Sequence, residues 1–388
     1  MPYKLPSIKV PLLRLNYSDE DLYMLSEGFR NILVSGHLTM STNVKLFEDA
    51  FAGWNHSKYA LGTNSGTSSL EIPLRAIDVR NKVVICPSNT YMATPLAAIH
   101  AGAKVAFVDT DPNNMQISVE SLRRVLKENS NVACLIMVHI AGLITEHIHE
   151  IILLCNQYGV KVLEDAAHAH GASFQGVRAG NFGFAGSFSF YHTKVMNAAE
   201  GGMMVTNDPE VYKVGVSLRE HGKLESGKNI HSNIGYNWRF SEINALLGIY
   251  EIKNAEHKAL ERRHIASKYD SLLSDTNGIR KLAIHPKLVP AYYKYVIYLE
   301  DGLSREKIKK SLREKFGIEC PGEVYSDPCH LQPVFKSYPE YMISNTSETF
   351  LNTQKVCNQH MCLPLYPGLQ DFEVEYVTSS LIEILRSS

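Results

Sequence analysis

The 388-residue chain has no apolar run approaching the roughly 20 residues that a membrane-spanning helix needs. It also has no excess of either charge, because 39 Lys and Arg residues face 40 Asp and Glu residues and give a formal net charge of −1. Such a chain has no bulk attraction for nucleic acid or for an anionic membrane. We therefore expect neither nucleic acid nor a membrane among its partners.

Cysteine is scarce, and its pattern is not that of a disulfide framework. The seven cysteines are odd in number and scattered, and no C-x-x-C pair occurs. This pattern predicts reduced thiols that serve as small apolar side chains. The first 22 residues contain prolines and charges, which a secretory signal peptide would not have. We therefore expect a cytoplasmic protein, and the 45% hydrophobic and 20% charged residues are those of an ordinary globular one.

The first two-thirds of the chain alternates β-rich runs with helix-length segments such as SVESLRRVLKEN (118–129). The β-rich runs are KVVIC (82–86), KVAFVD (104–109), VACLIMVH (132–139), VKVLED (160–165) and GSFSF (186–190). This alternation predicts an α/β fold in which helices cover a mostly parallel sheet. Ligands of such sheets bind beyond the carboxyl ends of the strands, where Asp109, His139 and Asp165 would lie.

The pattern changes near residue 248. The segment GIYEIKNAEHKALERRHIASKYDSLLSD (248–275) predicts one long amphipathic helix, YYKYVIYLED (292–301) a strand, and DFEVEYVTSSLIEILR (371–386) a final helix. We predict two domains with their boundary in the long helix. The large domain would span 1–250, with an N-terminal arm, and a smaller α+β domain would span 251–388.

One lysine has unusual neighbours. In SFYHTKVMNAAEGGMMVTND (189–208), Lys194 lies between an aromatic run and a Glu-Gly-Gly turn. Burial lowers the pKa of a lysine unless a partner compensates. Lys194 is therefore either a surface residue beside a strand or an amine that the protein uses as a nucleophile.

Two further segments carry residues suited to chemistry. In TNSGTSSL (63–70), Gly66 and Thr67 precede a helical run, where free N–H groups can hold an anion, although Ser and Thr there are also common helix caps. VLEDAAHAHG (162–171) ends a predicted strand at Asp165. It fits a capped helix start with solvated histidines, a metal site, or one aspartate paired with a cationic ring nitrogen. The metal site is disfavoured because no H-E-x-x-H or comparable spacing occurs.

A lysine after a strand, an aspartate at a strand end and a phosphate cradle are together what pyridoxal phosphate requires. The lysine forms a Schiff base, the carboxylate keeps the pyridine nitrogen protonated, and the helix end holds the phosphate. Together with the segments around them, these residues resemble those of one known family.

Nearly end to end, the sequence resembles the DegT/DnrJ/StrS family of pyridoxal-phosphate-dependent sugar aminotransferases, which have aminotransferase fold type I. The matching segments follow the family order: SGHLTMSTNVKLFEDAFA (35–52), TNSGTSSL (63–70), CPSNTYMATPLAAIHAGAKVAFVDTDP (86–112), VLEDAAHAHGA (162–172), SFYHTKVMNAAEGGMMVTND (189–208), GYNWRFSEINALLG (235–248), DPCHLQP (327–333) and LPLYPGL (363–369). Each is weak alone, and their order makes the resemblance specific.

The resemblance implies roles for residues around the cofactor ring. Lys194 matches the lysine that bonds to the cofactor, and Asp165 matches the residue that pairs with the pyridine nitrogen. Tyr91 takes the position of the aromatic side chain that stacks on the ring. His168 stands where the family usually has glutamine, beside the ring hydroxyl, and a histidine there can change the protonation of that oxygen.

The phosphate contacts are implied in the same way. Gly66, Thr67 and Ser189 match the phosphate-binding positions, and Ser189 precedes the lysine by five residues as in the family. Asn237 matches a residue that reaches the phosphate from the other subunit, so the resemblance implies a homodimer with shared active sites. From the residues alone, Asn237 would be a turn residue after Gly235.

The expected reaction is transamination between an amino donor, expected to be glutamate, and a keto-sugar. A dehydratase branch of the family has histidine at the lysine position, so Lys194 favours amino transfer. Arg239 is a candidate for binding the donor carboxylate, or else forms a helix-cap or interface ion pair, and His330 is a candidate for the sugar pocket. Ala141 and Ser41 depart from the family pattern, and we expect both nearer the substrate than the cofactor.

Two other functions stay open from the sequence. A regulator or sensor of the same family would bind pyridoxal phosphate without turnover. A metal-dependent hydrolase would use Asp165, His168, His170 and His139 and would require a metal ion in place of the cofactor.

Overall fold

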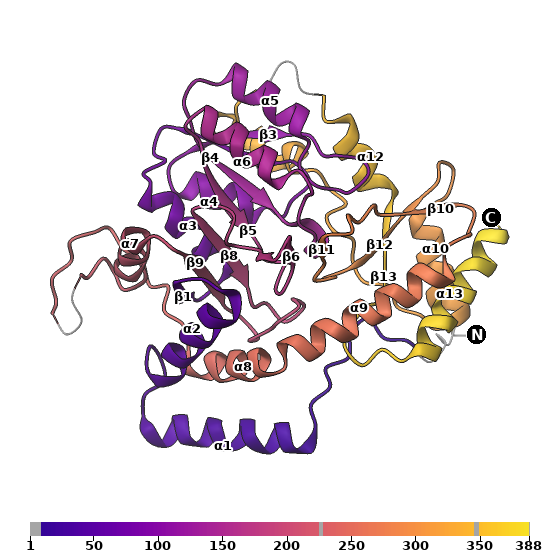
Figure 1. Cartoon of the computed structure of the whole chain (residues 1–388), viewed down its shortest axis with the longest axis horizontal. Helices are drawn as coiled ribbons and strands as arrows, with labels where there is room; N and C mark the ends of the chain where they lie inside the picture. Colours follow the sequence, from indigo (N-terminus) through magenta and orange to yellow (C-terminus); the bar gives the residue numbers. More distant parts are fainter. Residues whose placement is uncertain (1–8, 225–227, 345–348, 388) are drawn as a thin grey trace.

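A seven-stranded sheet forms the centre of the molecule in the computed structural model, which describes residues 9–224, 228–344 and 349–387 (Figure 1). Its strands, in the spatial order β1-β9-β8-β5-β4-β2-β3, are β1 Tyr59–Thr63, β9 Gly202–Thr206, β8 Ala185–Ser189, β5 Lys161–Asp165, β4 Val132–Val138, β2 Val83–Pro87 and β3 Lys104–Val108. Strands β8, β5, β4, β2 and β3 are parallel, and β9 is antiparallel to both of its neighbours. The predicted α/β class with a mostly parallel sheet is confirmed.

Helices cover both faces of this sheet because alternate side chains of each strand enter opposite cores. In β4, Leu135 and Met137 pack into one core, and Cys134 and Ile136 into the other. The first core also contains residues of α2 Thr42–Asn55, α5 Val119–Glu128, α6 Ile148–Gln157 and α8 Glu242–Lys253. The second contains residues of α3 Gly66–Ala76, α4 Ala93–His100 and α7 Pro209–Arg219. The result is a three-layer α/β/α arrangement.

Helix starts in this layer coincide with capping residues in the sequence. The Ser118 hydroxyl accepts the Ser121 N–H at 3.3 Å ahead of α5, and Ser65 caps α3 by accepting the Ser68 N–H at 3.2 Å. The helical run predicted to follow Gly66 and Thr67 begins earlier, at Gly66 itself, with its first N–H groups at the sheet edge.

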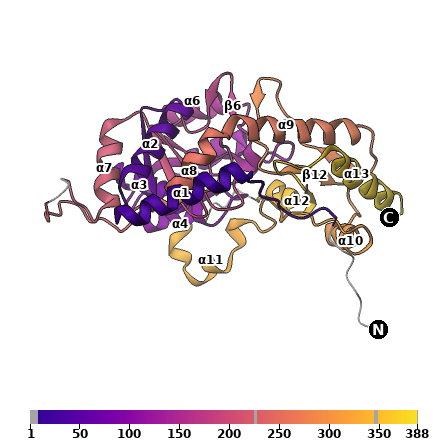
Figure 2. The ribbon, with the colours of Figure 1, turned by 90° about the horizontal axis from the view of Figure 1, so that it is seen from below.

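A second core lies at the other end of the molecule, where α9 Ala255–Leu272 and α13 Asp371–Arg386 lie side by side (Figures 1 and 2). Its sheet consists of β10 Ile279–Lys281, β12 Tyr295–Leu299 and β13 His360–Leu363. Further elements in the C-terminal part are β11 Leu288–Val289, α10 Arg305–Ser311, a π-helical turn Leu312–Phe316, α11 Pro333–Ser337 and α12 Leu351–Gln359. β11 pairs with β6 Ser173–Phe174, which also pairs with β7 Val177–Arg178.

The single long helix predicted over 248–275 is wrong in one respect, because two helices, α8 and α9, meet at Asn254. The Asn254 side-chain amide donates to the Tyr250 carbonyl at 3.0 Å, and its φ and ψ of −99° and 3° leave the helical region. An asparagine that binds the backbone in this way competes with the regular helix.

Part of the C-terminal segment packs back onto the large sheet. Cys329 and Phe335 pack into the second core on that sheet, the one that contains Ile136. The Ile343 N–H donates to the Val105 carbonyl at 2.8 Å. The division at residue 250 stays a prediction. Within the residues that the structure describes, no helix is both long and apolar enough to span a bilayer. Helix α1 Asp19–Ser35 lies along α8, at the lower edge of Figure 1.

Candidate active site

A cavity of about 460 Å³ lies at the carboxyl ends of β4, β5 and β8. It is lined by Ser65, Gly66, Thr67, Leu70, Tyr91, Ala93, Val138, Asp165, Ala167, His168, Ser189, Tyr191, Thr193, Lys194, Glu200, Tyr293 and Tyr325. Seven of the ten predicted site residues are in this lining, although they come from widely separated parts of the sequence. The parallel strands bring them to one edge, as expected for this sheet type.

Lys194 lies in the turn after β8, where its N–H donates to the Tyr191 carbonyl at 2.8 Å. Its Nζ is 4.9 Å from the centroid of the Tyr293 ring. Burial lowers the pKa of the Lys194 amine to about 8; the charge of Asp165 opposes this shift and the charge of Lys294 adds to it. Lys194 is half-buried and lines the cavity, which favours the interpretation of its amine as a nucleophile over that of a surface residue. With a pKa of about 8, part of the amine is neutral near physiological pH.

The lowered pKa predicts a pH profile for labelling this lysine. We expect the rate at which trinitrobenzenesulfonate modifies residue 194 to rise with pH and to be half-maximal near pH 8, because the neutral amine reacts. A lysine with its ordinary pKa would be less than about 1% neutral at that pH. Mass spectrometry of the peptide that contains residue 194 gives the rate, and Lys194→Met gives the background. A midpoint near pH 10.5, the ordinary value, would contradict the expectation.

Asp165 ends β5, and each of its oxygens accepts one hydrogen bond. The Thr94 hydroxyl donates to Oδ2 at 2.7 Å, and the Ala167 N–H donates to Oδ1 at 3.2 Å. Burial raises the pKa of the carboxyl, while these two hydrogen bonds and the charge of Lys194 lower it. A buried carboxylate of this kind is suited to pairing with a cationic ligand group.

The preceding residue, Glu164, points to the opposite side of the strand and binds the loop before β8. Its carboxylate accepts the N–H groups of Gly180, Phe182 and Gly183 at 2.6–2.7 Å, and it lies 2.8 Å from Nε2 of His139. These contacts fix the turn that leads into β8. Glu164 therefore helps to position the lysine without lining the cavity.

An anion cradle forms where α3 begins opposite the end of β8. A Cβ atom on Gly66 would lie 2.8 Å from Cβ of Ser189, and one on Gly202 would lie 2.1 Å from the Ser65 carbonyl oxygen. Only glycine permits these close approaches. They bring the first N–H groups of α3 and the Ser189 hydroxyl to the same cavity, which favours an anionic ligand group.

Aromatic rings line the remaining wall. The Tyr91 ring is 63% exposed and stacks on Tyr325 at a centroid distance of 5.8 Å. His168 stacks on Tyr293 at 4.1 Å and 18°. Burial, followed by the charges of Lys194 and Lys294, holds the pKa of His168 well below its usual value, so this imidazole is neutral.

Three predicted residues do not line this cavity. Asn237 is exposed, and Arg239 pairs with Glu220 at 2.8 Å, as in the ion-pair interpretation. The His330 ring contacts the Ser88 hydroxyl and stacks on Phe350. The substrate roles of Arg239 and His330 and the partner-site role of Asn237 stay predictions.

The histidines predicted as solvated or metal-binding are buried in other surroundings. His170 lies among the rings of Phe51, Phe188 and Phe190, and burial lowers its pKa to about 3. His139 is paired with Glu164. Among the residues that the structure describes, no group of three or more His, Cys, Asp or Glu could hold a metal ion.

The two residues that depart from the family pattern, Ala141 and Ser41, do not line the cavity. Ala141 is buried with a φ of 58°, and its carbonyl accepts the Tyr293 N–H at 3.0 Å. Ser41 donates its N–H to Glu242 at 2.8 Å. The position of Ala141 therefore supports Tyr293 through the backbone.

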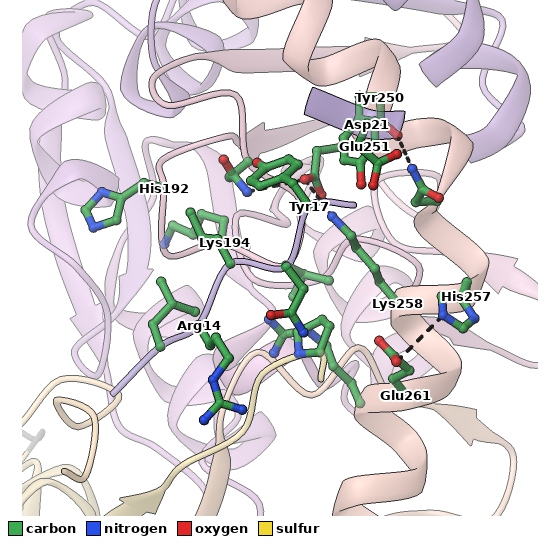
Figure 3. Close-up of a pocket in the computed structure, with 18 of the residues that line it drawn as sticks. Arg14, Tyr17, Asp21, His192, Lys194, Tyr250, Glu251, His257, Lys258 and Glu261 are labelled. Carbon is green, nitrogen blue, oxygen red and sulfur yellow. Dashed lines mark hydrogen bonds and ion pairs between the residues drawn. The ribbon is translucent and has the colours of Figure 1, made fainter. Parts of the chain in front are cut away.

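A second cavity, of about 540 Å³, shares Lys194 with the first (Figure 3). Figure 3 shows the N-terminal residues Arg14 and Tyr17 on one side and Glu251 and Lys258, from α8 and α9, on the other. Its wall includes the buried Arg262, whose Nη1 donates to two carbonyls and whose Nε has no hydrogen-bond partner in the described chain. This wall therefore places a buried guanidinium near the cavity.

The sequence and the fold both match known proteins. The model of the DegT/DnrJ/EryC1/StrS aminotransferase family matches residues 24–382. The chain is 32% identical over 378 residues to a UDP-4-amino-4,6-dideoxy-N-acetyl-beta-L-altrosamine transaminase from Campylobacter jejuni subsp. jejuni, with 96% of each chain covered. It is 30% identical to an uncharacterized protein from Methanocaldococcus jannaschii, covering 92% of this chain and 93% of the relative.

Among solved structures, DesV from S. venezuelae, in complex with a ketimine intermediate, superposes with a TM-score of 0.88 at 26% identity. The match covers 98% of this chain and 99% of that one. The similarity therefore includes both the large sheet and the C-terminal core.

Proposed function

Because the chain belongs to the DegT/DnrJ/EryC1/StrS aminotransferase family, we propose that it transfers an amino group from glutamate to the keto group of a nucleotide-linked sugar. The sequence predicts the family, fold type I, the cofactor pyridoxal phosphate and the class of sugar aminotransferases, and these predictions are confirmed. The observation that carries the proposal is that Asp165, which ends β5, and Lys194, which follows the neighbouring parallel strand β8, line one cavity.

The residues present fit pyridoxal phosphate. The anion cradle of Gly66, Thr67 and Ser189 suits its phosphate, and the Tyr91 ring suits its aromatic face. Asp165 is a buried carboxylate that accepts two hydrogen bonds and, within the described chain, has no salt-bridge partner. Such a carboxylate suits a protonated ring nitrogen. When bound, the cofactor supplies an aldehyde for the amino group and a ring that accepts the electron pair left when a substrate carbon loses its proton.

The protein side chains would then hold the cofactor and move protons. Nζ of Lys194, whose lowered pKa leaves part of the amine neutral near physiological pH, would take the proton from the donor's carbon and return a proton to the sugar carbon in the second half-reaction. Asp165 would keep the ring nitrogen protonated through its ion pair. The stack of Tyr91 on Tyr325 would cover one side of the ring and limit the access of water.

Two observations support the substrates. The Campylobacter relative is named for a UDP-linked amino sugar, which favours a nucleotide-linked keto-sugar. A carboxylate donor such as glutamate is supported by the second cavity, whose lining includes both Lys194 and the guanidinium of the buried Arg262. In one chain Arg239 is already paired with Glu220, so its role toward the donor would require that pair to open.

The test is a panel of nucleotide-linked and free 3-keto and 4-keto sugars assayed with glutamate. We expect a nucleotide-linked sugar to be aminated, and glutamate alone to convert the yellow cofactor to its amine form. Conversion by glutamate with no accepted sugar would reject the substrate proposal. No conversion by glutamate or glutamine would favour a regulator or sensor that binds the cofactor without turnover.

We also propose a homodimer whose active sites contain residues of both subunits. Large apolar side chains are exposed on α1 and near Asn237: Tyr23 is 69%, Val34 78% and Ile234 87% exposed. An exposed apolar face of this kind favours a protein partner. A second copy is supported because the exposed Asn237, which matches a residue acting across the dimer, lies outside its own chain's cavity.

This arrangement predicts a defect in cofactor binding for Asn237→Ala. One hydrogen bond to a charged group contributes about 1.5–3 kcal/mol, so we expect cofactor affinity to fall roughly ten- to a hundredfold. Fluorescence titration of the protein with pyridoxal phosphate measures the loss. Thermal unfolding without cofactor should be unchanged, because the Asn237 side chain is exposed.

Subunit mixing tests whether Asn237 acts across the interface. A heterodimer of Lys194→Ala with a variant of Asn237 that binds the cofactor poorly would carry both lesions in one site and leave the other site intact. Activity should reappear when the two inactive proteins are mixed and refolded. Heterodimers without recovered activity would place Asn237 in its own subunit's site or outside the site.

A further inference from the structure

Tyr325 is held in the wall of the cofactor cavity by a strained backbone. Its φ is 67°, in the left-handed region that bulky side chains seldom adopt. Such conformations persist where the surroundings impose them, and they cluster at functional sites. Nearby, Cys329 donates its N–H to the Ser88 carbonyl at 2.9 Å and its thiol to the Thr90 carbonyl, which ties this segment to the loop that carries Tyr91.

The Tyr325 side chain connects two residues that face the cofactor. Its hydroxyl lies 3.0 Å from Nε2 of His168, and its ring stacks on Tyr91. It also stacks on the His168 ring at 5.7 Å and 22°. All three residues line the same cavity.

The positions of the protons follow from the partners that are present. Burial holds the pKa of Tyr325 well above and that of His168 well below their usual values, so the pair consists of a neutral phenol and a neutral imidazole. Nδ1 of His168 is buried and has no hydrogen-bond partner in the described chain. A buried N–H without an acceptor is the rarer and costlier arrangement, which places the imidazole proton on Nε2. Nε2–H then donates to the Tyr325 oxygen, and the Tyr325 O–H is left to donate into the cavity.

We propose that Tyr325 contacts the cofactor directly, donating its O–H to the ring oxygen of pyridoxal phosphate, while His168 positions the hydroxyl from behind. This rests on the cofactor site of the proposed function. A donor at that oxygen stabilises its ionised form and lowers its pKa. The role that the resemblance gives to residue 168 is thereby shared with a tyrosine from the C-terminal part of the chain.

The first test is the absorbance of the bound cofactor, titrated with pH in Tyr325→Phe. Loss of the donor should raise the midpoint of the titration by about one unit, a tenfold change in proton affinity. Tyr293→Phe is the matched control, because its hydroxyl contacts Thr193 at 3.2 Å while its ring also stacks on His168. Equal midpoints in the wild type and Tyr325→Phe, or equal shifts in both variants, would overturn the proposal.

The second test needs no cofactor and no turnover. In the full chain labelled with ¹⁵N-histidine, the His168 signals are identified by their loss in His168→Asn. We expect the proton on Nε2 in the wild type, and a proton on Nδ1 would mean that Tyr325 donates to His168, against the proposal. Both tests can succeed if no keto-sugar is accepted, so failure of the proposed substrate and failure of this inference are distinguishable.

Discussion

Lys194→Ala should lose transamination by at least about 10⁴-fold, because it removes the nucleophile and the proton carrier together. Burial lowers the pKa of this amine to about 8, and it lines both cavities of the site. Steady-state assays with glutamate and a keto-sugar measure the loss. Borohydride reduction followed by peptide mass spectrometry should find the cofactor attached to residue 194 in the wild type and no such adduct in the variant.

Lys294→Met is the matched control for this experiment. Lys294 is also partly buried, and its Nζ lies 5.0 Å from the same Tyr293 ring that Lys194 contacts at 4.9 Å. The control should keep the adduct on residue 194. Because the charge of Lys294 lowers the pKa of Lys194, its removal should shift the midpoint of labelling to higher pH. A cofactor adduct at wild-type yield in Lys194→Ala would show that another lysine is the nucleophile.

The sequence predicts those site residues that lie at the ends of the predicted strands or directly next to them in the chain. Asp165 ends a predicted strand, Lys194 follows another, and Gly66 is expected directly before a helical run, so a local pattern and one rule about parallel sheets place all three. The sheet class is predictable for the same reason, since the strands are contiguous apolar runs.

The other half of the site depends on contacts between distant segments. Tyr293 and Tyr325 reach the cavity from the C-terminal part of the chain, and Thr94 bonds Asp165 across 71 residues. No periodicity marks these residues, and only the aromatic run around Tyr293 hints at a buried position. The left-handed φ of Tyr325 is a tertiary effect that opposes its local preference.

The break between α8 and α9 shows a different limit. The helical pattern passes through Asn254 without interruption, and asparagine is tolerated in many helices. Where α8 ends, the Asn254 side chain donates to the Tyr250 carbonyl and competes with the regular helical hydrogen bonds. Helix propensity alone therefore does not tell whether the helix continues through Asn254 or breaks there.

Asp165→Asn should cost two to four orders of magnitude in turnover if the carboxylate keeps the ring nitrogen of the cofactor protonated. Each unit of pKa on that nitrogen corresponds to about 1.4 kcal/mol, and an equal change in barrier is about tenfold in rate. Single-turnover reduction of the cofactor's absorbance by glutamate measures the first half-reaction directly. Retention of more than about a tenth of the wild-type rate would contradict the role.

The same substitution separates function from folding. Burial raises the pKa of Asp165 above its unfolded value, so keeping the ionised carboxylate buried costs free energy of folding. The folded state is favoured most below the unfolded pKa, and this contribution is lost as pH rises through the folded pKa. Asparagine removes that cost at neutral pH. The Thr94 hydroxyl, which lies 2.8 Å from the Thr90 hydroxyl, can reverse to accept from the amide. The cofactor-free variant should therefore unfold at the same or a higher temperature than the wild type, whereas its turnover falls. A variant that lost stability and activity together would identify Asp165 as a structural residue of the strand end.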